Sequence, residues 1–143
     1  MILVDLNLLL YATNRDSVHH EAARHWLQRA LDDEEPVALP WIVVLGFVRV
    51  TTNGRVFPKP LTVKQAVEVV DGWLAMPIVR LLLAGEEHWR ILKGLLEETG
   101  TAGNLTTDAH LAALAIENGC TLCSTDTDFA RFPRLRWINP LVA

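Results

Sequence analysis

Short apolar runs alternate with longer amphipathic segments along the whole chain. Each short run has the length of a buried strand, and each longer segment carries apolar residues at the spacing of one helix face. Strands that alternate with helices in this way predict an α/β fold, in which a mostly parallel sheet has helices on both faces. The expected strands cover residues 2–5, 37–39, 78–83, 121–124 and 136–138.

The helices expected between these strands have recognisable ends. Ser17 and Thr62 are residue types that cap helix N-termini, and Pro40 suits the first turn of a helix. Gly119 is expected to end the last long helix in a left-handed conformation. The expected helices cover residues 7–13, 18–31, 41–52, 63–74, 86–98 and 106–118, with a further turn at 128–131.

Length and composition fit one globular domain, which we expect to span residues 1–143. Half of the residues are hydrophobic and the formal net charge is −4. A protein that wraps nucleic acid is usually basic, so a nucleic-acid role would need a local positive patch and bound cations. Two cysteines are too few for a secreted disulfide scaffold. We see neither a signal-peptide pattern nor the roughly 20 apolar residues of a membrane span, and we expect a cytoplasmic protein that does not contact membranes.

Aspartates occupy the places where chemistry is found in parallel sheets. Asp5 ends the first expected strand, Asp126 and Asp128 follow the fourth, and Asp108 lies in the first turn of a late helix. Ligands of such folds bind beyond the carboxyl ends of the strands. Carboxylate oxygens suit Mg²⁺ or Mn²⁺, and two such ions can activate a water for phosphodiester cleavage. Each aspartate alone is equally well explained as a turn former or a helix cap, so the metal hypothesis depends on their convergence.

Three stretches resemble the PIN-domain nucleases, and specifically the VapC-type toxins of bacterial toxin–antitoxin pairs. They read ILVDLNLLLY (2–11), NLTTDAHLAALA (104–115) and STDTDF (124–129), and the resemblance extends essentially from end to end. It implies a PIN-like three-layer αβα sandwich with about five strands. It also implies an Mg²⁺-dependent endoribonuclease that is inhibited by a cognate antitoxin and is often a homodimer.

The same resemblance assigns roles to individual residues. The catalytic, metal-binding acids of the family fall on Asp5, Asp108 and Asp126, and Asp128 becomes a supporting acid. Side chains expected to hold a metal-bound water or a carboxylate from the outer side are Asn7 and Thr125.

One position departs from the family pattern. PIN nucleases usually carry a glutamate on the helix after the second strand, and here Gly46 stands in its place, with no Asp or Glu between Pro36 and Glu68. We expect tight binding of one metal and weak or substrate-dependent binding of a second. The departure leaves open a catalytically weak or inactive PIN-like module that binds RNA or a partner.

An aspartyl-phosphate phosphatase is a further alternative, because those enzymes also begin with a strand that ends in aspartate. They usually need a second aspartate two residues later, and Asn7 occupies that position here. The sequence therefore favours the nuclease.

Basic and apolar surface segments suggest binding roles. Arg49, Arg55 and Arg131 are candidates for contacts with RNA phosphates, although a solvated face explains each of them as well. The nearly all-apolar run 41–50 is expected to serve the core and, in part, an antitoxin helix or a dimer contact.

Overall fold

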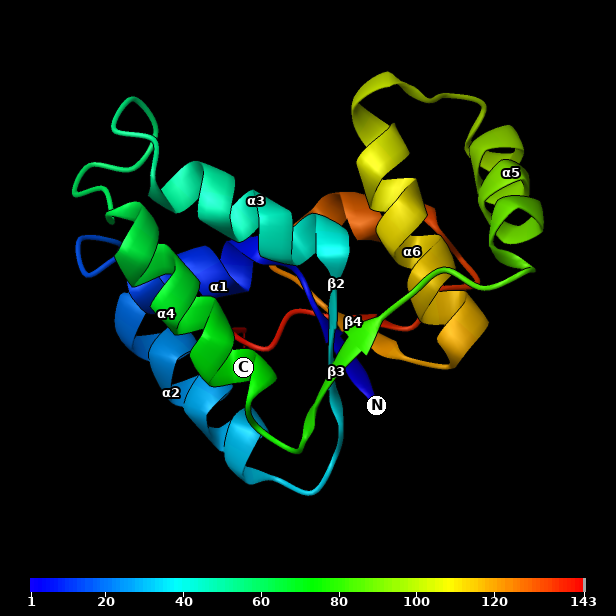
Figure 1. Ribbon diagram of the computed structural model, residues 1–143. Helices are drawn as coiled ribbons and strands as arrows, with labels where there is room; N and C mark the ends of the chain where they lie inside the picture. The colour runs from blue at the N-terminus through cyan, green and yellow to red at the C-terminus, as the bar shows by residue number, and fades with distance from the viewer. Residues whose placement is uncertain (143) are drawn as a thin grey trace.

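The computed structural model describes residues 1–142. Its central sheet contains five strands, all parallel, in the order β3-β2-β1-β4-β5 (Figure 1). The expected fold class is therefore confirmed, with a sheet that is fully rather than mostly parallel. The strands are β1 (Ile2–Val4), β2 (Val37–Pro40), β3 (Val79–Leu82), β4 (Thr121–Cys123) and β5 (Trp137–Ile138).

Helices cover both faces of this sheet. In Figure 1, α1 to α4 lie together on one side, and α5 and α6 lie on the other. Right-handed crossovers require this arrangement, because the chain moves from β1 through β2 to β3 in one direction and then returns to β4 on the other side of β1. The α-helices are α1 (Leu6–Thr13), α2 (His20–Asp32), α3 (Trp41–Thr51), α4 (Val63–Leu74), α5 (His88–Thr99) and α6 (Thr106–Asn118).

Two short 3₁₀ helices, η1 (Gly103–Leu105) and η2 (Thr127–Arg131), precede α6 and follow β4. Among the helices of residues 1–142, none is long and apolar enough to cross a membrane.

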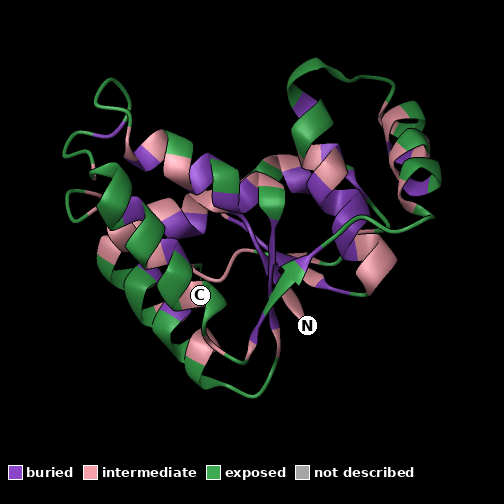
Figure 2. Cartoon of the chain, in the orientation of Figure 1, coloured by how far each residue is buried: buried purple, intermediate pink, exposed green. Residues whose placement is uncertain are grey.

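The hydrophobic core lies between the sheet and the helices (Figure 2). Leu3 and Val4 of the central strand are fully buried, and Leu122 of β4 beside it is fully buried as well. Phe47 of α3 is also fully buried and meets the ring of Trp73 of α4 edge-on, with centroids 4.8 Å apart. Truncating such a phenylalanine to alanine costs about 3–5 kcal/mol, so α3 is firmly fixed to the sheet.

The helix ends agree with the sequence at two of the three predicted caps. Thr62 and Gln65 form a capping box at the start of α4, and Gly119 follows α6 with φ of 66°. The Ser17 cap is wrong, because α2 begins at His20 and its N-cap, His19, makes no side-chain capping bond. The Ser17 hydroxyl instead accepts from the His19 amide at 3.1 Å, the local turn that serine often forms outside helices.

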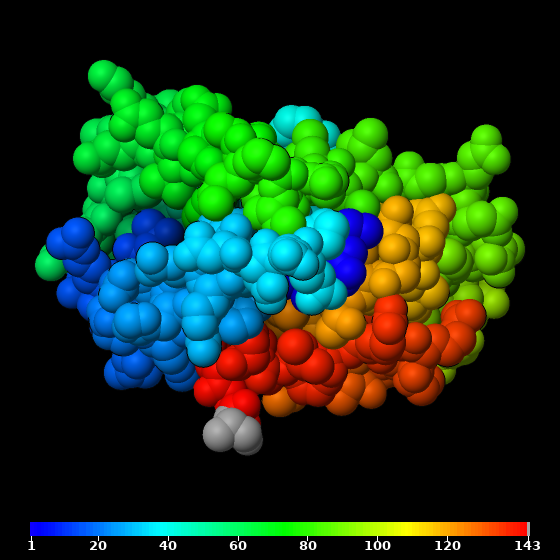
Figure 3. Space-filling model, turned by 90° about the horizontal axis from the view of Figure 1, so that it is seen from below, coloured from blue at the N-terminus to red at the C-terminus, as the bar shows by residue number. Residues whose placement is uncertain are grey.

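The two ends of the sheet differ in what covers them. Figure 3 views the molecule from the end where the strands begin, and there the C-terminal segment lies along α2. Leu141 of this segment packs against the core. The carboxyl ends of the strands face the other way, and the acidic residues gather at that end.

Candidate metal centre

The acidic residues meet at the carboxyl ends of β1 and β4. Asp5 follows β1 directly, Asp126 follows β4 after two residues, and Asp108 lies in the first turn of α6. All three line one pocket of about 310 Å³. The structure therefore brings together the three acids that the sequence proposed as one site.

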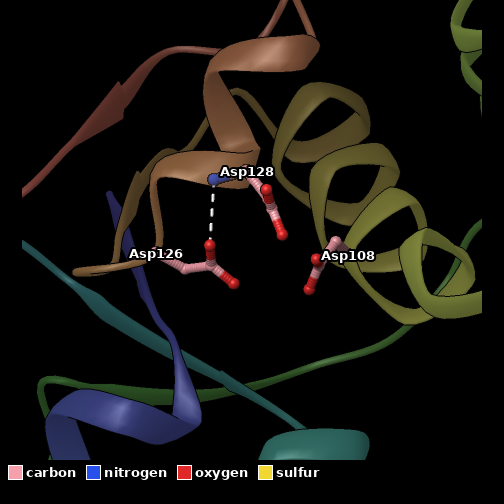
Figure 4. A group of neighbouring side chains, drawn as sticks. All are labelled: Asp108, Asp126 and Asp128. Carbon is pink, nitrogen blue, oxygen red and sulfur yellow. Dashed lines mark hydrogen bonds between the residues drawn. The ribbon is translucent and has the colours of Figure 1, made fainter.

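Two of these pocket acids, Asp108 and Asp126, form a tighter group with a third carboxylate, that of Asp128. Asp108, Asp126 and Asp128 each offer an oxygen, and these oxygens lie within 4.8 Å of one another (Figure 4). The turn of η2 places Asp128 here, because its amide donates to Asp126 Oδ1 at 2.9 Å. Asp128, which we expected to be a supporting acid, thus lies close enough to Asp108 and Asp126 to share an ion with them.

Asp5 is held from behind by two hydrogen bonds. Its Oδ1 accepts from the Leu6 amide at 2.8 Å, which caps α1, and its Oδ2 accepts from Ser124 Oγ at 2.7 Å. Burial raises the pKa of Asp5, and these two bonds partly oppose that rise. A carboxylate oxygen has two lone pairs, so both oxygens keep capacity for a further ligand.

Ser124 connects the residues of this side of the site. It is fully buried; its hydroxyl donates to Asp5 and accepts from Asn7 Nδ2 at 3.1 Å and from the Asp126 amide at 3.0 Å. Ser124 was not among the residues that we expected from the sequence, where we named its neighbour Thr125. The parallel register could have revealed it, because Val4 pairs with Cys123 and the next residues along the two strands are Asp5 and Ser124.

Asn7 leaves a polar atom without a partner. Its Oδ1 is buried and accepts no hydrogen bond within residues 1–142, although Asn7 lines the pocket. Buried acceptors are nearly always satisfied in folded proteins, so this oxygen calls for a ligand such as a cation or a water bound to one.

The charges of the pocket need compensation. The pKa of Asp108 is raised to about 6, first by burial and then by the negative charges of Asp126, Asp5 and Asp128. A divalent cation would remove this repulsion. The donors are all oxygens, the set that Mg²⁺ and Mn²⁺ prefer, so the residues present fit such an ion.

Comparison with known proteins identifies the fold family. The model of the PIN domain matches residues 2–135. The chain belongs to the PIN-domain family. It is 45% identical to VapC ribonuclease Mb2897 of Mycobacterium bovis over 99% of this chain and 96% of that one. It is 43% identical to ribonuclease VapC37 of Mycobacterium tuberculosis, with 98% and 97% covered.

Solved PIN-domain structures share the fold. VapBC2 of Rickettsia felis, bound to a promoter DNA fragment, matches with a TM-score of 0.72 at 21% identity, covering 97% of this chain and 98% of that one. A toxin–antitoxin complex from Klebsiella pneumoniae matches with a TM-score of 0.65 at 16% identity, covering 98% of each chain. The family resemblance noted in the sequence and the three-layer fold are thereby confirmed.

The α3 wall of the pocket contains Gly46, which we expected from the sequence to stand where an acid would be. Gly46 lines the pocket and is buried, and α3 contains no acidic residue. A Cβ atom added at Gly46 would lie 2.8 Å from Leu6 Cδ2, so the Leu6 side chain fills the space where a longer residue would begin. The described site therefore has no carboxylate from α3.

The three candidate arginines fall in different places. Arg49 lines the pocket one turn after Gly46 on α3. Arg131 Nε lies 3.9 Å from Asp128 Oδ1, at the rim of the acidic group. Arg55 belongs to the loop between α3 and α4 and does not line the pocket. Of the three candidates, Arg49 is the one that lines the acidic pocket, and Arg131 is the one that contacts an acid of the group.

Proposed function

We propose that this PIN domain is a divalent-metal-dependent endoribonuclease and the toxin of a type II toxin–antitoxin pair. The observation that carries the proposal is the group of three carboxylates within 4.8 Å at the carboxyl end of the sheet. The chain is 43–45% identical to VapC ribonucleases, and this similarity supports RNA as the substrate. The ion we propose is Mg²⁺, with Mn²⁺ as a substitute.

The residues of the site have different proposed roles. We assign Asp108 and Asp126, with Asp5 behind them, to metal binding and catalysis, and we add Asp128 as a direct ligand. When bound, the ion supplies positive charge that polarises the phosphodiester and lowers the pKa of a water. Ser124 and Asn7 fix the carboxylates on the sheet side of the site. The Arg49 guanidinium is suited to hold a phosphate on the α3 side.

One ion, rather than two, is the resting state that we propose. Gly46 contributes no carboxylate, so a second ion would lack a protein ligand on the α3 side. Phosphate oxygens of bound RNA would have to supply that ligand, as substrate phosphates often do for Mg²⁺.

The proposed partners follow from the family. A cognate antitoxin is proposed because structural relatives include toxin–antitoxin complexes, and a homodimer is proposed as the oligomeric state. Both cysteines are buried and unpaired, which fits the reducing cytoplasm as the compartment.

Cleavage of single-stranded RNA tests this function. The wild type should cleave it with Mg²⁺ and stop with EDTA, and Asp126→Asn should retain less than about a hundredth of the rate, since even residues outside the ligand shell cost 10–100-fold. Asp71→Asn, an exposed acid of α4, is the matched control and should cleave normally. Equal cleavage by Asp126→Asn would refute the assignment. Metal binding without cleavage would favour the inactive module that Gly46 leaves open.

A further inference from the structure

The outer face of α3 carries an uncovered stripe. Trp41, Leu45 and Arg49 follow one another at intervals of four residues and therefore lie on one face of the helix. Trp41 is 48% exposed and Leu45 is 62% exposed, whereas Val44 and Phe47 on the inner face are buried. Neighbouring large apolar side chains that are left open to solvent typically mark a binding surface.

The stripe forms one wall of a groove between α3 and α6. Thr107 and His110 of α6 form the opposite wall, and the groove has a volume of about 570 Å³. The His110 ring is held by His88, whose Nε2 lies 2.9 Å from His110 Nδ1. A groove of this size is within the range of small-ligand sites and can accept one nucleotide.

This groove opens directly into the acidic pocket. Ile42, Gly46, Arg49 and Thr107 line both of them. Gly46 is one of these shared residues, and the side chain of Leu6 lies against it.

We propose that the groove binds a base of the RNA next to the scissile phosphate, with Trp41 stacked on the base and Arg49 on a phosphate. The inference rests on the proposed ribonuclease function. Trp41 and Leu45 line the groove and not the acidic pocket, Arg49 lines both, and Asp108 and Asp126 line the pocket and not the groove. An unpaired nucleotide presents the matching order of base, ribose and phosphate, and aromatic stacking and arginine are the usual means of holding it.

A protein occupant fits the observations less well. The exposed apolar part of the groove consists of two large side chains, Trp41 and Leu45. A stable protein interface usually buries about 800 Å² on each partner. Continuity with the acidic centre also favours the substrate over an apolar helix of an antitoxin or of a second copy.

Steady-state RNA cleavage by Trp41 variants tests the proposal. Because Trp41→Leu removes the stacking partner of one base, it should raise KM about 10-fold while kcat stays within about twofold. Trp41→Phe should recover most of the loss, because phenylalanine can stack and leucine cannot. The control is Trp89→Ala, which removes a 63% exposed tryptophan of α5 and should leave KM unchanged.

A set of RNA substrates, each lacking one base, provides the second arm. For the wild type, KM should rise about 10-fold when one position beside the cleavage site is abasic. For Trp41→Leu, the same abasic substrate should raise KM little further than the substitution already has, as expected when Trp41 and that base interact. A wild type that cleaves RNA while Trp41→Leu keeps its KM would overturn this inference and leave the proposed function standing. A wild type that cleaves no RNA would overturn both. A dimer that becomes a monomer in Trp41→Leu, measured by sedimentation, would show an interface between copies and overturn the inference.

Discussion

The two walls of the acidic pocket are built in different ways. On the sheet wall, Ser124 ties Asp5, Asn7 and the Asp126 backbone together through hydrogen bonds of 2.7–3.1 Å. The helix wall is formed by α3 and the start of α6. There, the Asp108 carboxylate has no hydrogen bond within residues 1–142, and its pKa is raised to about 6. The sheet wall is thus organised by the protein itself, whereas the helix wall depends on a cation for its charge balance.

Ser124→Ala removes the hydrogen bonds of the sheet wall and should have the largest effect among the variants that compare the two walls. It removes the donor to Asp5 Oδ2 and the acceptor for the Asp126 amide. Loss of such supporting groups typically costs 10–100-fold in metal affinity or activity. The buried Asp5 oxygen left without its donor should also lower the free energy of unfolding by about 1–3 kcal/mol. Calorimetric Mn²⁺ titration and urea unfolding measure the two effects.

Thr125→Val is the matched control for Ser124→Ala, because it changes the neighbouring hydroxyl. It should change metal affinity less than twofold, since the contacts expected of Thr125 are made by Ser124. If Ser124→Ala and Thr125→Val lowered metal affinity equally, the claim that Ser124 organises the sheet wall would be contradicted.

Gly46→Glu adds a carboxylate to the helix wall and tests whether that wall can then hold a cation more tightly. The Leu6 side chain must move, but only its flexible end is in the way. Glutamate also favours a helix over glycine by about 0.5–1 kcal/mol, which offsets part of the charge repulsion that a further carboxylate adds to the metal-free pocket. We expect about one additional Mn²⁺ ion per chain in a calorimetric titration, or about 10-fold tighter binding, which corresponds to about 1.4 kcal/mol. Gly46→Gln has the same size without the charge and should produce neither change.

Asp108→Asn removes the negative charge of the helix wall and its repulsion from the other carboxylates, so it should stabilise the metal-free protein. Because the pKa of Asp108 is raised from 3.8 to about 6, the native state holds this proton more tightly than the unfolded state does. The resulting stability is fully present below pH 3.8 and is lost as the pH rises through about 6. After allowance for solvent screening, the variant should exceed the wild type by about 1 kcal/mol at pH 7.5 and by much less at pH 4.

Urea unfolding with EDTA at the two pH values measures this difference. Added Mg²⁺ should stabilise the wild type and have less effect on Asp108→Asn. A variant that is less stable than the wild type at pH 7.5 without metal would contradict the electrostatic account.

The fold could be predicted from local patterns because most of its signals are local. Periodicity identified the elements, and Thr62 and Gly119 ended helices as expected. The prediction that Ser17 caps α2 was wrong because a serine hydroxyl can accept a hydrogen bond from a nearby amide in a turn as well as at the start of a helix. The acids could be placed at one edge of the sheet because parallel strands share a direction.

The finer arrangement of the site required three-dimensional information. Ser124 reaches Asp5 across a strand pair separated by 119 positions, and sequence spacing does not report such a register. Asp128 joined the central group because a 3₁₀ turn bends it back toward Asp126. The groove and the acidic pocket share residues because α3 and α6 meet beside them, and no single segment encodes that meeting.

A crystal structure with bound Mn²⁺, located by anomalous scattering, tests the central claim most directly. We predict one strong peak among Asp108, Asp126 and Asp128, with Asp5 behind it. A peak bound elsewhere, or no peak at saturating Mn²⁺ in crystals of the intact protein, would contradict the metal centre from which the proposed function is built.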